Sequence, residues 1–398
     1  MILTYSYKLY LNTSQEKTLE RWLRTCNWIF NRALEQRIKA YERRKESVSY
    51  QDQQALLTDW RGRMDSLRLV PVTFERDALR RVDRGMKAFF RRVKAGQKPG
   101  FPRFKPFRRY RSLECLAVAK YLQGDRIRIP NLGLVRCRGR LLPIGKQRGL
   151  RIVHRESGWY AQIILDNGVT ISPREPQTSV GIDVGLASFA TLSTGDKIDN
   201  PRFARKAERK TRALQRRASR KKKGSANRRK AVQRLARQHE RVASQRRSFA
   251  HAEARKIVDR FDLIAFENLN IAGMVHGNLA RSIHDAAWSL FLFCLIFKAE
   301  NAGKSTVAVN PRGTSQECPR CGAVAKKSLS EREHVCPCGT RLCRDHAAAQ
   351  VILARALRGN GGLNSLVEEP ASVAPLVAVS ASRSDETRMP NGSDEPSM

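Results

Sequence analysis

The sequence is short of carboxylates. Its 398 residues contain 37 Asp and Glu against 76 Lys and Arg, which gives a formal net charge of +39 at pH 7. A much smaller charge is enough for solubility, so an excess of this size indicates a polyanionic partner. Nucleic acid is the first candidate, and an anionic membrane surface is the second.

Long apolar runs are also missing. The longest is AAWSLFLFCLIF at 286–297, and its 12 residues are too few for a bilayer, which needs about 20. This run therefore predicts a buried helix. The first 15 residues lack a basic segment followed by an apolar one, so they do not have the pattern of a secretory signal. These absences favour a cytoplasmic protein without a membrane partner.

The nine cysteines do not follow the pattern of a disulfide framework. Their number is odd, and five of them lie within 318–343, while Cys26, Cys115, Cys137 and Cys294 are scattered. This usage is typical of a protein from a reducing compartment with one clustered site.

The cluster is built from Cys318-x-x-Cys321 and Cys336-x-Cys338, with Cys343 nearby. A glycine follows each pair, where a tight turn needs a small residue. Four thiolates from two such pairs make a tetrahedral structural zinc site. The second pair is one residue shorter than usual, so Cys343 could replace one of its members. Reduced thiols without metal are the alternative, but a cluster of this size needs a reason, and zinc supplies one.

The residue pattern divides the rest of the chain. Residues 1–10 alternate like a strand, residues 15–95 have helical spacing, and residues 113–167 contain short apolar runs typical of strands. A proline-bearing linker at 171–179 predicts a domain boundary. The last segment, 359–398, is rich in Gly, Ser, Pro and acids, and we expect it to be a disordered tail.

Residues 202–247 are the most basic part of the chain, with 20 Lys or Arg and 2 acids. They predict a helical hairpin, because Ala, Leu and Val recur at helical spacing on either side of KKKGSAN. Solvated helix faces usually mix both signs of charge. Repulsion of this size is tolerated mainly where phosphates neutralise it.

A second basic stretch, KPGFPRFKPFRRYRS at 98–112, carries aromatic residues between its Lys and Arg side chains. Phe101, Phe104, Phe107 and Tyr110 could stack on unpaired nucleobases, while the Lys and Arg contact phosphates. The alternative is that the rings anchor the stretch on its own domain. The sequence does not choose between the two.

Three carboxylates stand out because the chain has so few. The strand FDLIAFENLN ends in Glu267, the strand VGIDVGL holds Asp183, and Asp345 begins the helix RDHAAAQVILARAL. Each has an ordinary explanation, such as a helix N-cap for Asp345. Together they could hold two Mg²⁺ ions about 3.5–4 Å apart, one to activate water and one to stabilise the leaving 3′ oxygen of a phosphodiester. A metal would also neutralise Glu267, whose charge is costly beside a buried strand.

The segment GIDVGL permits a second interpretation. Actin-like ATPases and sugar kinases also place an Asp-x-Gly on the first strand of a similar fold. They need further glycine-rich loops for phosphate and adenosine, and we find no convincing ones in this sequence. The net charge would also have no role in such an enzyme, so we rank this alternative well behind.

Several segments together resemble one known family. They are GIDVGLASFATLSTG, FDLIAFENLNIAGM, AENAGKSTVAVNPRGTSQECPRCG and CRDHAAAQVIL, with GFPRFKP at 100–106. They resemble the three split RuvC motifs and the zinc finger of the TnpB family of insertion-sequence proteins, which is related to type V CRISPR effectors. The resemblance extends over residues 5–358. The motifs are specific as a set, although each alone is weak.

The resemblance implies a multidomain α+β fold. An RNase H-like (RuvC) nuclease domain would carry a zinc-finger insertion, and a β-barrel wedge domain would carry an inserted helical recognition domain. The implied segments are 1–12 and 113–172 (wedge), 13–112 (recognition), 178–312 (nuclease), 313–343 (zinc finger), 344–358 (last nuclease helix) and 359–398 (tail).

The same resemblance implies an RNA-guided DNA endonuclease, a monomer bound to RNA in the prokaryotic cytoplasm. Its guide RNA would come from the transposon end, and its target would be double-stranded DNA beside a short adjacent motif. Asp183, Glu267 and Asp345 fall on the family's catalytic, Mg²⁺-binding positions. The positions that match its zinc ligands are Cys318, Cys321, Cys336 and Cys338.

Two features depart from the family pattern. The second cysteine pair is Cys-x-Cys where the family usually has Cys-x-x-Cys, and Ala347 stands where it usually has Asn. Some relatives have lost their nuclease residues and act as RNA-guided repressors, so a nuclease-inactive repressor is the alternative function. All three acids are present in this chain, and we favour the nuclease.

Overall fold

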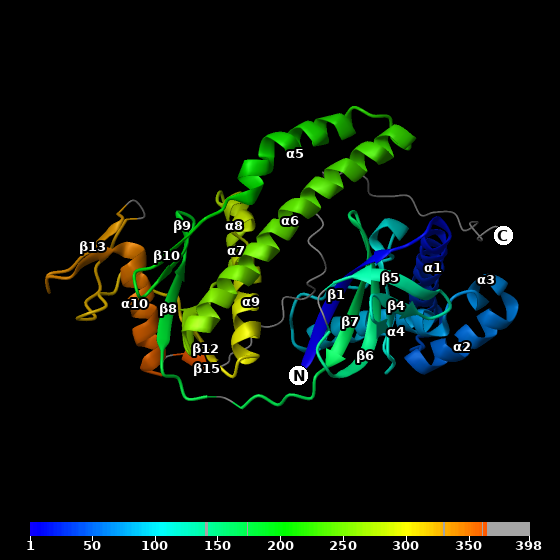
Figure 1. The fold of residues 1–398 in the computed structure, drawn as a ribbon, viewed down its shortest axis with the longest axis horizontal. Coiled ribbons are helices and arrows are strands. Elements are labelled where there is room, and N and C mark those ends of the chain that lie inside the picture. The colour runs from blue at the N-terminus through cyan, green and yellow to red at the C-terminus, as the bar shows by residue number, and fades with distance from the viewer. Residues whose placement is uncertain (140–141, 173, 329–330, 360, 364–398) are drawn as a thin grey trace. The chain divides into compact units, whose positions relative to one another are not determined.

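The chain forms two compact units in the computed structural model (Figure 1). The first is Met1–Val169, and the second begins at Thr170, beside the linker expected at 171–179. The residues that the structure describes are 1–139, 142–172, 174–328, 331–359 and 361–363.

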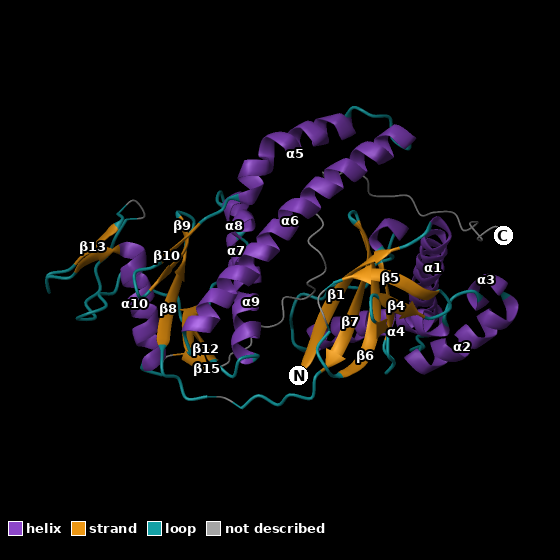
Figure 2. Cartoon of the chain, in the orientation of Figure 1, coloured by secondary structure: helices purple, strands orange, loops and turns teal. Residues whose placement is uncertain are grey.

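A seven-stranded antiparallel sheet forms the centre of the first unit (Figure 2). Its order is β2-β6-β7-β1-β5-β4-β3, so the N-terminal strand lies between β7 and β5. Among the described strands, hydrogen bonding leaves this sheet with two ends and does not by itself close the expected barrel. The strands are β1 (Ile2–Tyr10), β2 (Ser112–Cys115), β3 (Leu122–Gln123), β4 (Arg126–Ile129), β5 (Gly133–Arg138), β6 (Lys146–Arg155) and β7 (Gly158–Asp166).

The chain between β1 and β2 is mainly helical, as its spacing predicts. Helix α1 begins after Asn12, whose side-chain oxygen accepts a hydrogen bond from the Gln15 amide at 2.8 Å in a capping box. Its apolar face packs on α4, where the rings of Trp22 and Phe74 lie 5.8 Å apart. The elements are α1 (Thr13–Arg44), α2 (Tyr50–Arg63), α3 (Asp65–Arg68), α4 (Val72–Lys94) and the 3₁₀ turn η1 (Phe107–Arg109).

A mixed sheet forms the centre of the second unit, in the order β10-β9-β8-β11-β12-β15. The hairpin strands β8, β9 and β10 are antiparallel, whereas β8, β11 and β12 are parallel neighbours. The strands are β8 (Ser179–Val184), β9 (Ser188–Leu192), β10 (Lys197–Asp199), β11 (Leu263–Glu267), β12 (Ser305–Val309) and β15 (Gly361–Leu363).

The edge strand β15 corrects the expectation of a disordered tail from residue 359. Residues 361–363 lie antiparallel to β12, with Gly362 opposite Ala308. The remainder of the expected tail, from residue 364, lies outside the described residues.

Different helices cover the two faces of this sheet. Ile182 and Phe266 belong to a core shared with α6 and α9, while the opposite face packs on α10. Because side chains alternate across a strand, Asp183 and Glu267 lie on the α10 face. The helices are α5 (Phe203–Ser219), α6 (Ala226–Arg260), α7 (Ile271–Met274), α8 (Ala280–Ala286), α9 (Trp288–Glu300) and α10 (Arg344–Leu357).

Helices α5 and α6 form the basic hairpin and lie side by side (Figure 1). The charge run predicts an end at residue 247, but α6 continues to Arg260. Its last turns carry Ala254, Ile257 and Val258, which are buried in the core beneath the sheet. Burial of an apolar face therefore extends the helix beyond its charged part.

One stretch of the described chain, Ala280–Glu300, is long and apolar enough to cross a membrane by length and composition alone. Half of its most apolar window is buried inside the protein. Phe291 and Leu295 are fully buried in the core that covers the sheet. The buried helix expected at 286–297 is thus confirmed in kind, but it begins at Trp288, after the left-handed Ala287, and continues to Glu300.

Candidate active site and cysteine cluster

Asp183 and Glu267 stand at the same level of neighbouring parallel strands. Ile182 of β8 pairs with Phe266 of β11, so the next residue of each strand is one of the two acids. Both side chains are half-buried, on the face of the sheet that α10 covers. Strand pairing therefore brings together two carboxylates that are far apart in the sequence.

Helix α10 crosses this face of the sheet and carries Asp345. A Cβ at Gly181 of β8 would lie 2.1 Å from the carbonyl oxygen of Ala349, so glycine is what lets the helix backbone come this close. Near the end of the helix, Arg355 donates to the carbonyl of Asn310, just after β12, at 2.9 Å. Asp345 lies one helical turn before Ala349 and therefore near the same part of β8.

Burial and mutual repulsion raise the pKa of Asp183 to about 8. Removal from water is the largest cause, and the charges of Glu267 and Asp345 add to it, while Arg344 opposes them. Asp183 is thus close enough to both other carboxylates for their charges to disfavour its own. A bound cation would relieve this repulsion.

Glu267 is held by the segment that follows β12. Thr314 Oγ1 donates a hydrogen bond to Oε1 of Glu267. In the same segment, Glu317 forms an ion pair with Arg355 of α10, with 2.6 Å between the Arg355 Nη2 and Glu317 Oε2 atoms. Burial raises the pKa of Glu267, and the Thr314 hydrogen bond and the charge of Arg355 oppose that rise. The sequence does not point to Thr314 or Arg355, because neither has a periodic or paired pattern that marks it.

The three acids fit hard divalent cations. All the donors are carboxylate oxygens, which Mg²⁺ prefers, and a bound cation would favour the charged form of Asp183, whose pKa is raised chiefly by burial. Within the described residues, the oxygens of the three acids are not all within 4.8 Å of one another, as binding of one ion by all three would require. A pair of ions about 3.5–4 Å apart does not require such a close grouping, because two of the three carboxylates can each bind a different ion.

The sulfur atoms of Cys318, Cys321, Cys336 and Cys338 all lie within 4.8 Å of one another. Those of Cys318 and Cys338 are 3.7 Å apart, and those of Cys321 and Cys336 are 3.5 Å apart. Four thiols gathered in this way are the donor set of a structural zinc site. The short Cys-x-Cys pair thus completes the cluster without a fifth cysteine.

The two glycines expected at the turns have left-handed backbones. Gly322 has φ +74° and Gly339 has φ +85°, a region that side chains other than glycine rarely adopt. The Gly322 amide donates to the carbonyl of Cys318 at 2.9 Å, and the Gly339 amide to that of Cys336 at 3.0 Å. In each turn the glycine amide therefore donates to the carbonyl of the first cysteine of the pair, although the second turn is one residue shorter.

Backbone N–H groups favour the thiolate form of Cys318. Burial raises its pKa, but hydrogen bonds together outweigh burial and lower the pKa to about 5; the largest are from the backbone N–H groups of Cys321 and Arg320, followed by those with the side chains of His334 and Thr340. Zinc binds thiolates rather than thiols, so this turn is electrostatically suited to a metal.

Cys343 does not belong to the cluster, which corrects its expected role as a substitute ligand. Strands β13 (Glu333–Val335) and β14 (Arg341–Cys343) form a hairpin whose turn holds the second cysteine pair. Cys343 pairs with Glu333 at the open end of that hairpin, and its sulfur lies 3.6 Å from Lys197 Nζ. The length of the hairpin therefore separates it from the other four sulfurs.

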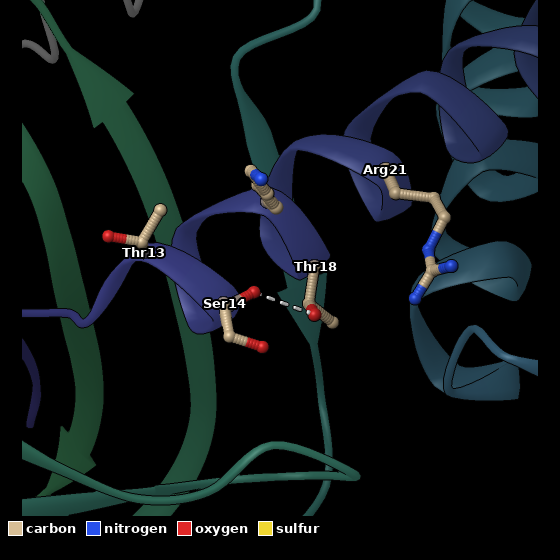
Figure 3. Close-up of a pocket in the computed structure, with 5 residues that line it drawn as sticks. Thr13, Ser14, Thr18 and Arg21 are labelled. Carbon is tan, nitrogen blue, oxygen red and sulfur yellow. Dashed lines mark hydrogen bonds between the residues drawn. The ribbon is translucent and has the colours of Figure 1, made fainter.

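A cavity in the first unit is distinct from these sites. It lies on the first turns of α1, where Thr18 Oγ1 donates to the Ser14 carbonyl at 2.9 Å (Figure 3). Its lining contains two cations and no carboxylate, Cys or His ligand for a metal, and we assign it no function. The lining residues are Thr13, Ser14, Lys17, Thr18 and Arg21.

Three regions of the chain match known families. Residues 162–277 match OrfB_IS605, described as "Probable transposase", residues 288–352 match the Cas12f1-like TNB domain, and residues 1–46 match the helix-turn-helix domain of OrfB_IS605. Over residues 1–46 the structure has β1 followed by the single long helix α1, not two helices joined by a turn.

Two proteins are similar over most of their length. A protein of Streptomyces pristinaespiralis named "Putative RNA-guided DNA endonuclease" is 32% identical over 368 residues, which cover 89% of each chain. "Putative RNA-guided DNA endonuclease InsQ" of Escherichia coli (strain K12) is 28% identical over 352 residues, covering 83% of this chain and 86% of that protein. A structure titled "Cryo-EM structure of the Cas12f1-sgRNA-target DNA complex" is 14% identical to this chain, with a TM-score of 0.34, and the match covers 89% of this chain and 99% of that chain.

The family matches include the candidate site residues. Asp183 and Glu267 lie within 162–277, and Asp345 and the clustered cysteines lie within 288–352. Because a relative shares 32% of its residues across 89% of both chains, the chain belongs to the TnpB (OrfB_IS605) family of insertion-sequence proteins.

Proposed function

We propose that the chain is a Mg²⁺-dependent, RNA-guided endonuclease that cuts double-stranded DNA beside a short adjacent motif. The observation that carries this proposal is the gathering of Asp183, Glu267 and Asp345 on one face of the second sheet. Relatives that match nearly the whole chain are named as RNA-guided DNA endonucleases, which supports the same activity.

In this proposal the second unit is an RNase H-like (RuvC) nuclease domain. Three antiparallel strands followed by two parallel ones, with helices on both faces, support that assignment. Residues 178–312 would supply the first two acids, and the helix expected at 344–358 the third. Residues 313–343, which hold the four-cysteine cluster, would be the zinc-finger insertion.

Each side chain has a role that its position supports. Asp183, Glu267 and Asp345 would bind the Mg²⁺ ions through carboxylate oxygens. When bound, the ions would supply an activated water and stabilisation of the leaving 3′ oxygen. Thr314 holds one oxygen of Glu267 by a hydrogen bond, so the other oxygen is presented in a fixed direction. Arg344 places a positive charge beside the acids.

The remaining features suit the nucleic acids that this function requires. The four clustered cysteines would hold a structural zinc ion. The α5–α6 hairpin and the net charge of +39 suit the phosphates of a guide RNA from the transposon end and of its hybrid with target DNA. We place the protein in the prokaryotic cytoplasm, as a monomer bound to RNA.

The test is plasmid cleavage. The chain is expressed with its flanking downstream RNA, purified as a particle, and incubated with Mg²⁺ and plasmids carrying the guide match beside randomised sequence. We expect double-strand breaks beside one enriched short motif, and no breaks with Asp183→Asn or without Mg²⁺. Binding of the matched site without breaks would overturn the nuclease and support an RNA-guided repressor. Ala347, which stands where the family usually has Asn, would then be the first residue to test as the cause of the lost cleavage. Failure to bind RNA would overturn the proposal that an RNA directs the protein to its target.

A further inference from the structure

The aromatic residues of the basic stretch 98–112 divide into two groups. Tyr110 is 2% exposed, and Phe107 packs against the core of the first unit with the Arg24 guanidinium 4.3 Å from its ring centre. Phe101 and Phe104 are instead 45% and 53% exposed. The two alternatives that the sequence left open thus apply to different rings, because two of them anchor the stretch and two face solvent.

The exposed rings lie on a backbone that is attached on both sides. The Lys105 carbonyl accepts hydrogen bonds from the side-chain amides of Asn27, at 2.8 Å, and Asn31, at 3.0 Å, both on α1. The Gly100 carbonyl accepts from Arg92 of α4 at 3.2 Å. The two exposed rings come between these attachments. Their exposure is therefore a property of the fold and not of a loose loop.

Phe101 continues a row of rings on α4. Its ring centre lies 5.1 Å from that of Phe89, which lies 5.1 Å from that of Phe90. Phe90 is 58% exposed. We call Phe90, Phe101 and Phe104 the aromatic patch. Phe101 and Phe104 are three steps apart along the chain, so their Cα atoms are at most about 11 Å apart, or about three base steps of a nucleic acid strand.

The surroundings of the aromatic patch carry charge of one sign. Residues 84–113 contain eleven Lys or Arg and no Asp or Glu, and Arg91 and Arg103, beside the rings in sequence, are exposed. Grouped apolar side chains on a surface mark a binding site, and this charge selects an anionic partner. Unpaired nucleic acid has both properties, because its bases offer flat apolar faces and its backbone offers phosphates.

We propose that the aromatic patch binds an unpaired DNA strand, with bases stacked on Phe90, Phe101 and Phe104 and phosphates on Arg91 and Arg103. A duplex cannot bind in this way, because its base faces are already stacked. Phe and Arg have no hydrogen-bond acceptor, so the Arg side chains can only donate to a ribose 2′-hydroxyl, the group that marks RNA, and none of these side chains accepts its proton. The site does not depend on the carboxylates, so it should bind DNA whether or not the chain cuts.

The experiment measures binding of a fluorescent thymidine oligonucleotide of about 12 nucleotides to the full-length protein, purified free of nucleic acid. We expect Phe104→Ala and Phe104→Leu to weaken binding about 5- to 140-fold, the effect of losing one stacked base. Phe104→Trp should retain affinity. Phe293→Ala is the matched control, because Phe293 is 43% exposed on α9, and it should bind like wild type.

The salt dependence separates stacking from charge. Phe104→Leu should leave the slope of log affinity against log salt unchanged, whereas Arg103→Gln should reduce it by about one. Wild-type affinity in Phe104→Leu would overturn stacking, because leucine keeps the apolar surface and removes the ring. If Phe104→Ala lost as much affinity for a DNA duplex as for the thymidine oligonucleotide, the assignment to an unpaired strand would be overturned. Tighter binding of a uridine oligoribonucleotide than of the thymidine oligonucleotide would overturn the assignment to DNA. If Phe293→Ala lost as much affinity for the oligonucleotide as Phe104→Ala, the assignment of binding to the aromatic patch would be overturned.

Discussion

Thr314 donates a hydrogen bond from Oγ1 to Oε1 of Glu267 and so ties the segment before the cysteine cluster to the end of β11. Thr314 is 3% exposed, and Cys318 follows four residues later. One buried hydroxyl thus joins the segment that leads into the cysteine cluster to this carboxylate.

Thr314→Val should slow single-turnover DNA cleavage about tenfold or more, because a hydrogen bond to a charged group is worth about 1.5–3 kcal/mol. Valine has nearly the shape of threonine, so the fold should be kept. Thr314→Ser retains the hydroxyl and should cut at close to the wild-type rate. Equal rates for the valine variant and the wild type would show that the hydroxyl does not position Glu267.

Asp183→Asn should abolish cleavage and raise the melting temperature in the presence of EDTA. The variant keeps the size of the side chain and removes a carboxylate that is disfavoured by burial and by the charges of Glu267 and Asp345, which relieves a cost of the metal-free fold. Mg²⁺ should raise the melting temperature of the wild type more than that of the variant. Wild-type melting curves that are identical with and without Mg²⁺ would contradict a metal-binding role for Asp183.

Gly181→Ala should lower both stability and cleavage. Its new Cβ would lie 2.1 Å from the Ala349 carbonyl oxygen and 2.8 Å from the Leu353 amide nitrogen, so α10 would have to move. Gly62→Ala is the matched control, since nothing lies within 4 Å of a Cβ there and alanine in a helix is favoured by up to about 1 kcal/mol. Calorimetry and cleavage of both variants check this, and a stable, active Gly181→Ala would show that α10 does not need its close approach.

Measuring zinc content should distinguish the four clustered cysteines, which would bind zinc, from Cys343, which would not. We expect one zinc per chain in the wild type, loss of that zinc in Cys318→Ser, and full retention in Cys343→Ser, because Cys343 lies outside the four-sulfur cluster. Elemental analysis of the dialysed proteins measures this directly. Zinc loss in Cys343→Ser with retention in Cys318→Ser would reverse the ligand assignment.

The first unit should lose stability as the pH rises through the slightly acid range. Burial raises the pKa of Glu75 from 4.5 to about 7, although its partner Arg61 opposes the rise. Between about pH 4.5 and 7 the folded state keeps a proton that the unfolded state has released, so the contribution of Glu75 to stability falls with rising pH. Glu75→Gln should flatten the profile of melting temperature in that window, and a profile parallel to that of the wild type would argue against this titration.

Local patterns were enough to predict much of the fold. Alternation predicted β1, helical spacing predicted the helices between β1 and β2, and the charge run predicted the α5–α6 hairpin. These are properties of neighbouring residues, which a local pattern records. The extension of α6 to Arg260 was missed, because it depends on burial against a sheet whose strands are distant in the sequence.

The sequence by itself determined which chemistry this protein carries: a few carboxylates at strand and helix ends, paired cysteines each followed by glycine, and a large positive charge. Only the tertiary structure decided which groups meet. Strand register sets Asp183 beside Glu267, a hairpin keeps Cys343 away from the other thiols, and a loop brings Thr314 to Glu267. These contacts depend on how strands and helices pack across long stretches of chain, and no local period encodes them.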